Sequence, residues 1–136
     1  KYVRKPSPEE QAKNIHEFIE GITNKYGLYP TNMTIDSADG GIYTQYWQMY
    51  NVQWSKVRKL GEPEMIDRVQ DLLAQGRLFA LKTPGNETML DEHKKYQWDP
   101  ATVNSDKPRV IKEYDHSVDA LKYDVLDNEQ LLGLTA

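Results

Sequence analysis

The sequence contains no cysteine and no long apolar run. The absence of thiols excludes both a disulfide framework and a thiolate metal site. No apolar stretch approaches the roughly 20 residues that span a bilayer, and residues 1–7 lack the apolar core of a signal peptide. A Gly-rich Lys-Ser/Thr loop of the kind that cradles nucleotide phosphates is also missing. We therefore expect a cytosolic protein with no membrane partner.

Positive charge is outnumbered as well. Lys and Arg number 17 against 21 Asp and Glu, so the net charge is −4. This argues against a strong free-standing nucleic-acid binder, because neutralisation of phosphates dominates such affinity. The length of 136 residues and the 38% hydrophobic content suit one domain, residues 1–136. Basic residues still cluster in three places, which suits DNA contact if another component holds the DNA: Lys1-Arg4-Lys5, Lys56-Arg58-Lys59 and Lys107-Arg109-Lys112.

Helix signals and strand signals alternate along the chain. Ser7, Pro8 and Glu10 form a capping serine, a first-turn proline and a capping-box glutamate, so a helix is predicted from there to Gly27. Its apolar residues, Ile15, Phe18, Ile19, Ile22 and Tyr26, should bury one face against a sheet. Further helices are predicted over residues 42–50, 62–75, 87–96 and 115–126. In the helix over 62–75, one face carries the apolar residues Met65, Ile66, Val69, Leu72 and Leu73. Strands are predicted over 32–36, 51–57 and 77–82, a loop over 97–114 and a frayed tail over 127–136. Such alternation indicates a layered α/β fold.

Acidic residues and a histidine gather at the predicted helix start near residue 115. Residues three and four apart share one side of a helix, so Asp115, His116 and Asp119 can converge there. Val118, Leu121 and Val125 form a separate apolar stripe. Carboxylate oxygens near an imidazole are donors that suit a divalent cation. We expect Asp115 itself to be the helix N-cap rather than a metal ligand.

Two other segments bear on the identity of the fold. One is Met33-Thr34-Ile35-Asp36-Ser37-Ala38-Asp39, and the other is residues 65–79, which end in Gly76-Arg77-Leu78-Phe79. These two segments and the run from Asp115 to Tyr123 resemble the nuclease domain of the large terminase subunit of tailed bacteriophages. The three segments have the order and spacing of their counterparts in that family. The resemblance covers roughly residues 30–127. It implies a ribonuclease H-like α/β fold, with a mixed sheet flanked by helices.

The resemblance also implies a site and a reaction. Asp36, His116 and Asp119 would be the catalytic and metal-binding residues, and Mg²⁺ or Mn²⁺ the cofactor. The reaction would be two-metal hydrolysis of phosphodiester bonds by an endonuclease that cuts concatemeric double-stranded DNA during packaging. Partners would be the terminase ATPase domain, the small terminase subunit and the portal, in the host cytoplasm.

Family members begin with strands that supply another essential aspartate, and no such strand is encoded before Ser7. We therefore expect a domain that lacks the first strands and that cuts DNA weakly or not at all by itself. Two alternatives stay open: a non-catalytic phage packaging module that docks on another component or on DNA, and a different ribonuclease H-like nuclease such as a resolvase.

Several residues favour plainer interpretations. From its local sequence Asp36 is a turn-forming aspartate, and only the resemblance makes it a ligand. Asp39 is expected to be a turn residue, and both a position near the metals and one away from them stay open. His16 and His93 are expected to be solvated, since histidine prefers partly exposed sites. The aromatic residues between Tyr43 and Trp54 favour core packing over the stacking of unpaired bases.

Overall fold

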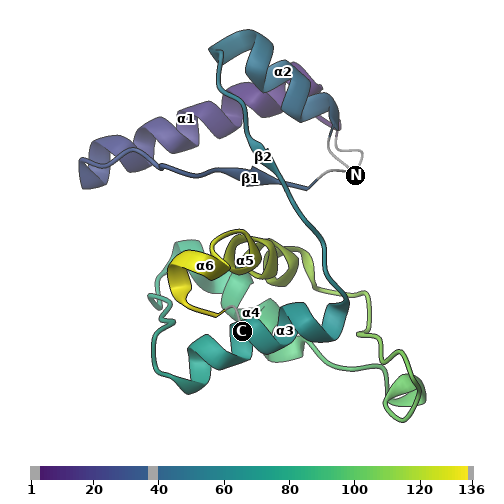
Figure 1. Ribbon diagram of the computed structural model, residues 1–136. Helices are drawn as coiled ribbons and strands as arrows, with labels where there is room; N and C mark the ends of the chain where they lie inside the picture. The colour runs from purple at the N-terminus through teal and green to yellow at the C-terminus, as the bar shows by residue number, and fades with distance from the viewer. Residues whose placement is uncertain (1–3, 37–39, 135–136) are drawn as a thin grey trace. The chain divides into compact units, whose positions relative to one another are not determined.

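The structure is a computed structural model that describes residues 4–36 and 40–134. The chain forms two compact units, Lys1–Val57 (unit 1) and Arg58–Ala136 (unit 2). Asp39 lies outside the described residues. No helix in the described ranges is long and apolar enough to cross a membrane. Figure 1 shows the helices and strands of each unit.

Unit 1 pairs two helices with a short parallel ladder (Figure 1). Helix α1 (Pro8–Tyr26) begins with the predicted capping box between Ser7 and Glu10, and it ends at Gly27 in the left-handed conformation, φ 69°. Strand β1 (Thr34–Ile35) lies parallel to β2 (Ser55–Lys56), with helix α2 (Gly40–Tyr50) between them in the chain. The described strands are therefore fewer and shorter than predicted and run parallel, and the α/β class is confirmed.

The core of unit 1 is built around Tyr46, whose side chain is 1% exposed. Ala12 and Ile19 of α1 pack on it, and Trp54 meets its ring edge-on at 5.4 Å between centroids. The prediction of aromatic core packing is thus confirmed at this residue. Helix α1 packs against α2 as well as against residues flanking the strands, so the expected helix-on-sheet arrangement is only part of its environment. Phe18 and Tyr26 are exposed rather than buried, at 68% and 59%.

His16 is not the solvated residue that the sequence suggested. Its ring stacks on Tyr50 at 3.8 Å between centroids, its Nδ1 lies 3.1 Å from the Tyr46 hydroxyl, and its Nε2 lies 3.0 Å from Glu20. Helix α2 packs against α1, so Tyr46 and Tyr50 cover part of the His16 ring. His93 is likewise half-buried, with Nδ1 2.8 Å from the carbonyl oxygen of Met89. Both expectations of solvated histidines were wrong.

Unit 2 is helical. Helix α5 (His116–Asp127) packs against α3 (Glu62–Ala74) and α4 (Glu87–Lys95). Short elements complete the unit: the 3₁₀ turns η1 (Pro84–Asn86) and η2 (Pro100–Thr102), and helix α6 (Glu129–Leu132). The apolar stripe of α5 is confirmed, because Val118 and Val125 are buried and Leu121 packs against the cluster that contains Val125.

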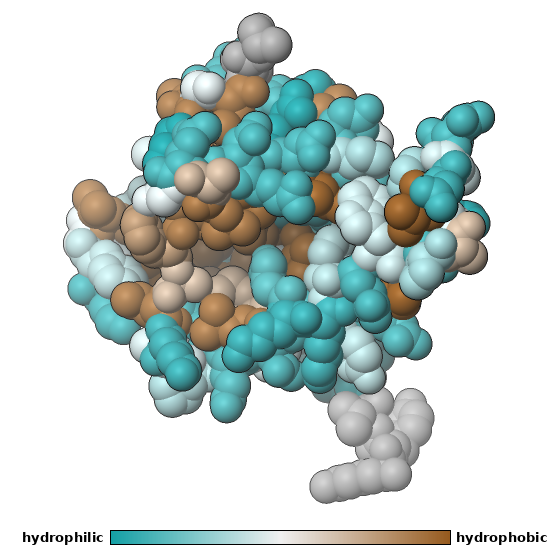
Figure 2. Space-filling view, turned by 90° about the horizontal axis from the view of Figure 1, so that it is seen from below, coloured by the Kyte–Doolittle hydropathy of each residue, from teal (hydrophilic) through white to brown (hydrophobic). Residues whose placement is uncertain are grey.

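Three details of unit 2 differ from prediction. Leu73 is 55% exposed because α3 turns only the face carrying Leu72 towards α5. Residues 77–82 form no strand, since within the described residues no neighbouring strand pairs with them, and Phe79 and Leu81 are exposed. The predicted frayed tail contains α6, where Glu129 is buried and bonded to Arg58 and Arg68. Figure 2 shows one face of the molecule on which apolar residues reach the surface around a hollow.

The predicted loop before α5 is held by its own hydrogen bonds. A bridge joins Trp98 to Val110, with hydrogen bonds of 2.8 and 3.0 Å on either side of it. The buried hydroxyl of Thr102 accepts a hydrogen bond from the backbone N–H of Arg109 at 3.0 Å. This ordering fixes the point at which the chain enters α5, and so the placement of the acidic residues that begin it.

Candidate functional site

Asp36 of unit 1 follows the last residue of β1 directly and is half-buried. The ladder holds this position, because the backbone N–H of Val57 donates to the carbonyl oxygen of Ile35 at 3.1 Å. Carboxyl ends of parallel strands are where α/β folds place their binding residues. The structure therefore agrees with the strand end that the motif predicted for Asp36.

Asp119 of unit 2 lies in the first turn of α5, where the helix dipole favours a negative charge. Asp115 occupies the N-cap position as predicted, but its side chain makes no capping hydrogen bond. Glu92 of α4 caps the helix instead, since it accepts hydrogen bonds from both the backbone N–H (2.9 Å) and the hydroxyl of Ser117. These bonds lower the pKa of Glu92 below its ordinary value. The start of α5 is thus fixed by a tertiary contact.

His116 is exposed at the first position of α5 and lies close enough to Glu92 to help lower the pKa of that carboxyl, after the larger effect of the Ser117 hydrogen bonds. His116 and Asp119 share the first turn of α5, as expected. Asp36 belongs to unit 1, whereas His116 and Asp119 belong to unit 2. The expectation that the carboxylates of Asp36 and Asp119 meet in one site stays a prediction.

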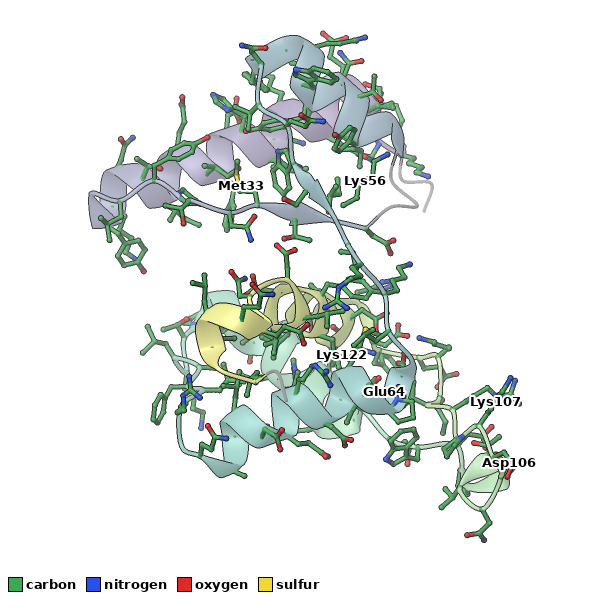
Figure 3. The ribbon with its side chains drawn as sticks, in the orientation of Figure 1. Met33, Lys56, Glu64, Asp106, Lys107 and Lys122 are labelled. Carbon is green, nitrogen blue, oxygen red and sulfur yellow. The ribbon has the colours of Figure 1, made fainter. Side chains whose placement is uncertain are left out.

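The side chain of Lys122 is the most buried charged group near Asp119, at 2% exposed. Its Nζ lies 2.9 Å from Oδ1 of Asp119, 2.5 Å from Oε1 of Glu62 and 2.9 Å from the hydroxyl oxygen of Tyr96. Tyr96 in turn donates to Oε1 of Glu62 at 2.9 Å. The contacts of Lys122 with Glu62 and Tyr96 are hydrogen bonds, and its contact with Asp119 is an ion pair. Figure 3 shows Lys122 reaching from α5 into the interior of unit 2.

These contacts set the charge state of the cluster. Burial alone would lower the pKa of Lys122, but Glu62, Tyr96 and Asp119 raise it above its ordinary value. Burial alone would raise the pKa of Glu62, but hydrogen bonds from Lys122 and Tyr96 hold it below its ordinary value. Burial raises the pKa of Tyr96 to about 12. Near neutral pH the cluster therefore contains an ammonium, an ionised Glu62 and a neutral phenol.

A second lysine approaches the same carboxylates from the solvent side. Nζ of Lys112 lies 3.6 Å from Glu62, 3.7 Å from Asp115 and 4.0 Å from Oδ2 of Asp119. Its side chain is 63% exposed, so these are loose surface ion pairs of small energetic value. Oδ1 of Asp119 is different: it is buried, and no well-directed hydrogen bond reaches it from the described residues. The ion pair with Lys122 is what compensates that oxygen.

The donor set fits Mg²⁺ or Mn²⁺ in its chemistry, because both cations prefer carboxylate oxygen. Asp119 offers Oδ2, which is not held by Lys122. No group of three or more His, Asp or Glu side chains is placed to hold a metal ion within the ranges that the structure describes. Asp119 is therefore a single carboxylate of unit 2 that could bind a cation, with His116 beside it on the helix. The role of Asp36 as a further ligand stays a prediction from the sequence.

Sequence reasoning missed the groups around Asp119, namely Glu62, Glu92, Tyr96, Lys112 and Lys122. Lys122 alone carried a local signal, since it follows Asp119 by three residues and so lies on the same side of the helix. The remaining four lie in other elements or in the preceding loop, and no spacing rule connects them with Asp119.

Comparisons with known proteins agree on the family. The family described as "Terminase RNAseH like domain" matches residues 10–127. The solved structure of the large terminase from a thermophilic bacteriophage is similar to the chain, with a TM-score of 0.75 at 18% sequence identity. The match covers 94% of this chain and 30% of that one, so the chain spans about a third of the terminase it matches. No curated protein matches the chain significantly. The ribonuclease H-like fold is thereby confirmed, and the chain belongs to the family of terminase RNase H-like domains.

Proposed function

We propose that this chain is a metal-dependent endonuclease domain of a phage large terminase, which cuts concatemeric double-stranded DNA in the host cytoplasm. The observation that carries the proposal is the family match over residues 10–127, which includes Asp36, His116 and Asp119. The net charge of −4 suits a nuclease whose DNA is held by other components. We take those components to be the terminase ATPase domain, the small terminase subunit and the portal.

In this proposal Asp36 and Asp119 hold Mg²⁺ or Mn²⁺, and His116 is a further ligand or a proton carrier. When bound, a pair of such cations supplies Lewis-acid activation of water and stabilisation of the leaving oxygen. The chain's own contribution is orientation. Glu92 fixes the first turn of α5, and Lys122 engages one oxygen of Asp119. The other oxygen is the one available for ligation.

The first experiment measures metal binding, because binding does not depend on the activity of a longer protein. Calorimetric titration with Mn²⁺ is expected to show binding that Asp36→Asn and Asp119→Asn each weaken at least tenfold, since even the loss of a group that only orients a metal ligand typically costs 10–100-fold. Asp71→Asn removes an exposed carboxylate of α3 and is the matched control, expected to bind as the wild type does. Equal binding by all four proteins would refute the proposed site.

A nicking assay on supercoiled plasmid with Mn²⁺ tests the reaction itself. Any nicking above background should disappear in Asp36→Asn and Asp119→Asn and persist in Asp71→Asn. Nicking that survives in both aspartate variants would come from another source and would count against the proposal.

One observation favours a second candidate, a non-catalytic packaging module. Asp119 forms an ion pair with a buried lysine, which is also how a purely structural carboxylate is satisfied. This candidate predicts no heat of Mn²⁺ binding. It also predicts unchanged binding to DNA or to packaging partners when Asp36, His116 and Asp119 are all replaced by Asn or Gln.

A further inference from the structure

Lys122 is held from three directions by residues of three helical segments. Its partners are Glu62 at the start of α3, Tyr96 at the end of α4 and Asp119 in its own helix. An ammonium that is 2% exposed, hydrogen-bonded to Glu62 and Tyr96 and ion-paired with Asp119 cannot move without breaking several contacts. Lys122 is therefore a fixed point within unit 2.

The charges around this fixed point leave Asp119 available to an outside cation. In formal charges, Lys122 and the exposed Lys112 contribute two positive charges and Glu62, Asp115 and Asp119 contribute three negative charges, so the group keeps one net negative charge. The shortest of the lysine's three contacts, at 2.5 Å, is to Glu62. Glu62 is thus the closest partner of Lys122, and Asp119 shares the lysine's positive charge with it.

The two oxygens of Asp119 have different environments. Oδ1 is buried and lies 2.9 Å from Nζ of Lys122, whereas Oδ2 lies 4.0 Å from the exposed Lys112. A carboxylate that is fixed through one oxygen presents the other in one direction. Partners of this kind, which orient a ligand without touching the metal, typically change metal affinity 10–100-fold.

We propose that Lys122 is a positioning residue of the nuclease site, which holds Oδ1 of Asp119 so that Oδ2 is presented to a divalent cation, with Glu62 and Tyr96 fixing the lysine. The inference depends on the proposed function, because it takes Asp119 to be a metal ligand. Lys122 stays bound to Oδ1 of Asp119 when the cation binds, whereas Lys112 moves away from Oδ2.

The two lysines make a matched pair for a mutational test. Lys122→Met and Lys112→Met both remove one positive charge near Asp119, so simple electrostatics predicts tighter Mn²⁺ binding in both. Positioning predicts about tenfold weaker binding in Lys122→Met, and equal or tighter binding in Lys112→Met. The probe is Mn²⁺ alone, titrated by electron paramagnetic resonance, with paramagnetic broadening of the amide signals of residues 118–120 to locate the ion. Binding by a folded Lys122→Met at wild-type strength or tighter would overturn the inference.

A second measurement needs no variant and decides the matter if Lys122→Met does not fold. The ammonium of Lys122 is shielded from solvent, so its ¹⁵Nζ signal is expected in the wild type. On saturation with Mg²⁺ the signal should persist and shift, because the lysine keeps its three partners. Disappearance of the signal would mean that the cation displaces Lys122, and the positioning role would be wrong.

Asp119→Asn separates this inference from the proposed function. If the wild type shows no Mn²⁺ broadening around Asp119, or if Asp119→Asn shows the same broadening, the proposed function fails and this inference with it. If binding is lost in Asp119→Asn but unchanged in Lys122→Met, only the role of Lys122 fails.

Discussion

The cluster of Lys122, Glu62 and Asp119 makes a quantitative prediction about stability without metal. Lys122→Met leaves Glu62 and Asp119 facing each other as like charges, and Glu62→Gln leaves the buried ammonium with one carboxylate instead of two. Removal of one partner from a fully buried ion pair costs about 3–5 kcal/mol. The carboxylates here are 21% and 24% exposed and can partly rehydrate, so we expect about 2–3 kcal/mol for each variant.

The double variant Glu62→Gln/Lys122→Met should be little worse than the less stable single variant, because the charges that each single change leaves unpaired are removed together. The coupling energy is then about 2 kcal/mol, within the range seen for residues in direct contact. Lys112→Met is the control and should change stability by less than about 0.5 kcal/mol, as is usual for an exposed ion pair.

Native-state hydrogen exchange of the α5 amides measures these free energies within unit 2 itself. Each single variant should exchange roughly 30–150 times faster than the wild type at buried positions such as Leu126, since about 1.4 kcal/mol corresponds to a factor of ten. Single-variant effects that add to within about 0.5 kcal/mol in the double variant would refute the cluster as an interacting unit.

Three further changes test other parts of the fold. Glu129→Gln should make the free energy of unfolding, measured with urea between pH 3 and 7, fall less steeply towards low pH. Hydrogen bonds from Arg68 and Arg58 hold the pKa of Glu129 below its ordinary 4.5, so they stabilise the fold above that pH, and this stabilisation is lost as the pH falls through the lowered pKa. If the free energy of unfolding of Glu129→Gln depends on pH as that of the wild type does, these ion pairs contribute nothing to stability. Leu72→Ala removes a side chain that is 3% exposed and should cost about 2–5 kcal/mol in the same assay, whereas a loss below about 1 kcal/mol would mean a loosely packed core. Gly27→Ala places a side chain in the left-handed conformation at the end of α1 and should cost about 1–2 kcal/mol, read from faster exchange of the last α1 amides.

Sequence patterns correctly predicted the bounds of a helix where interactions within a few residues set them. The capping box at Ser7 and the glycine at position 27 set the bounds of α1, because both act through hydrogen bonds and dihedral angles within a few residues. The apolar stripe of α3 failed only at Leu73, where the direction of packing rather than the period decides burial. Residues 77–82 have a strand-like composition, but a strand forms only beside a partner strand. Among the described residues no such partner lies beside 77–82, and this outweighs their β-propensity.

In the candidate site, too, some features follow from the sequence and others only from the tertiary structure. The amino-acid sequence by itself determined the family, through three ordered motifs, and it placed Asp36 after a strand and Asp119 in the first turn of a helix. Only the tertiary structure decided what surrounds Asp119: Lys122 meets Glu62 across 60 residues of chain and Tyr96 across 26, and Glu92 caps α5 from 25 residues away. Such contacts arise when α3, α4 and α5 pack together, and no periodicity within one helix encodes which charged side chains its neighbours will bring to it.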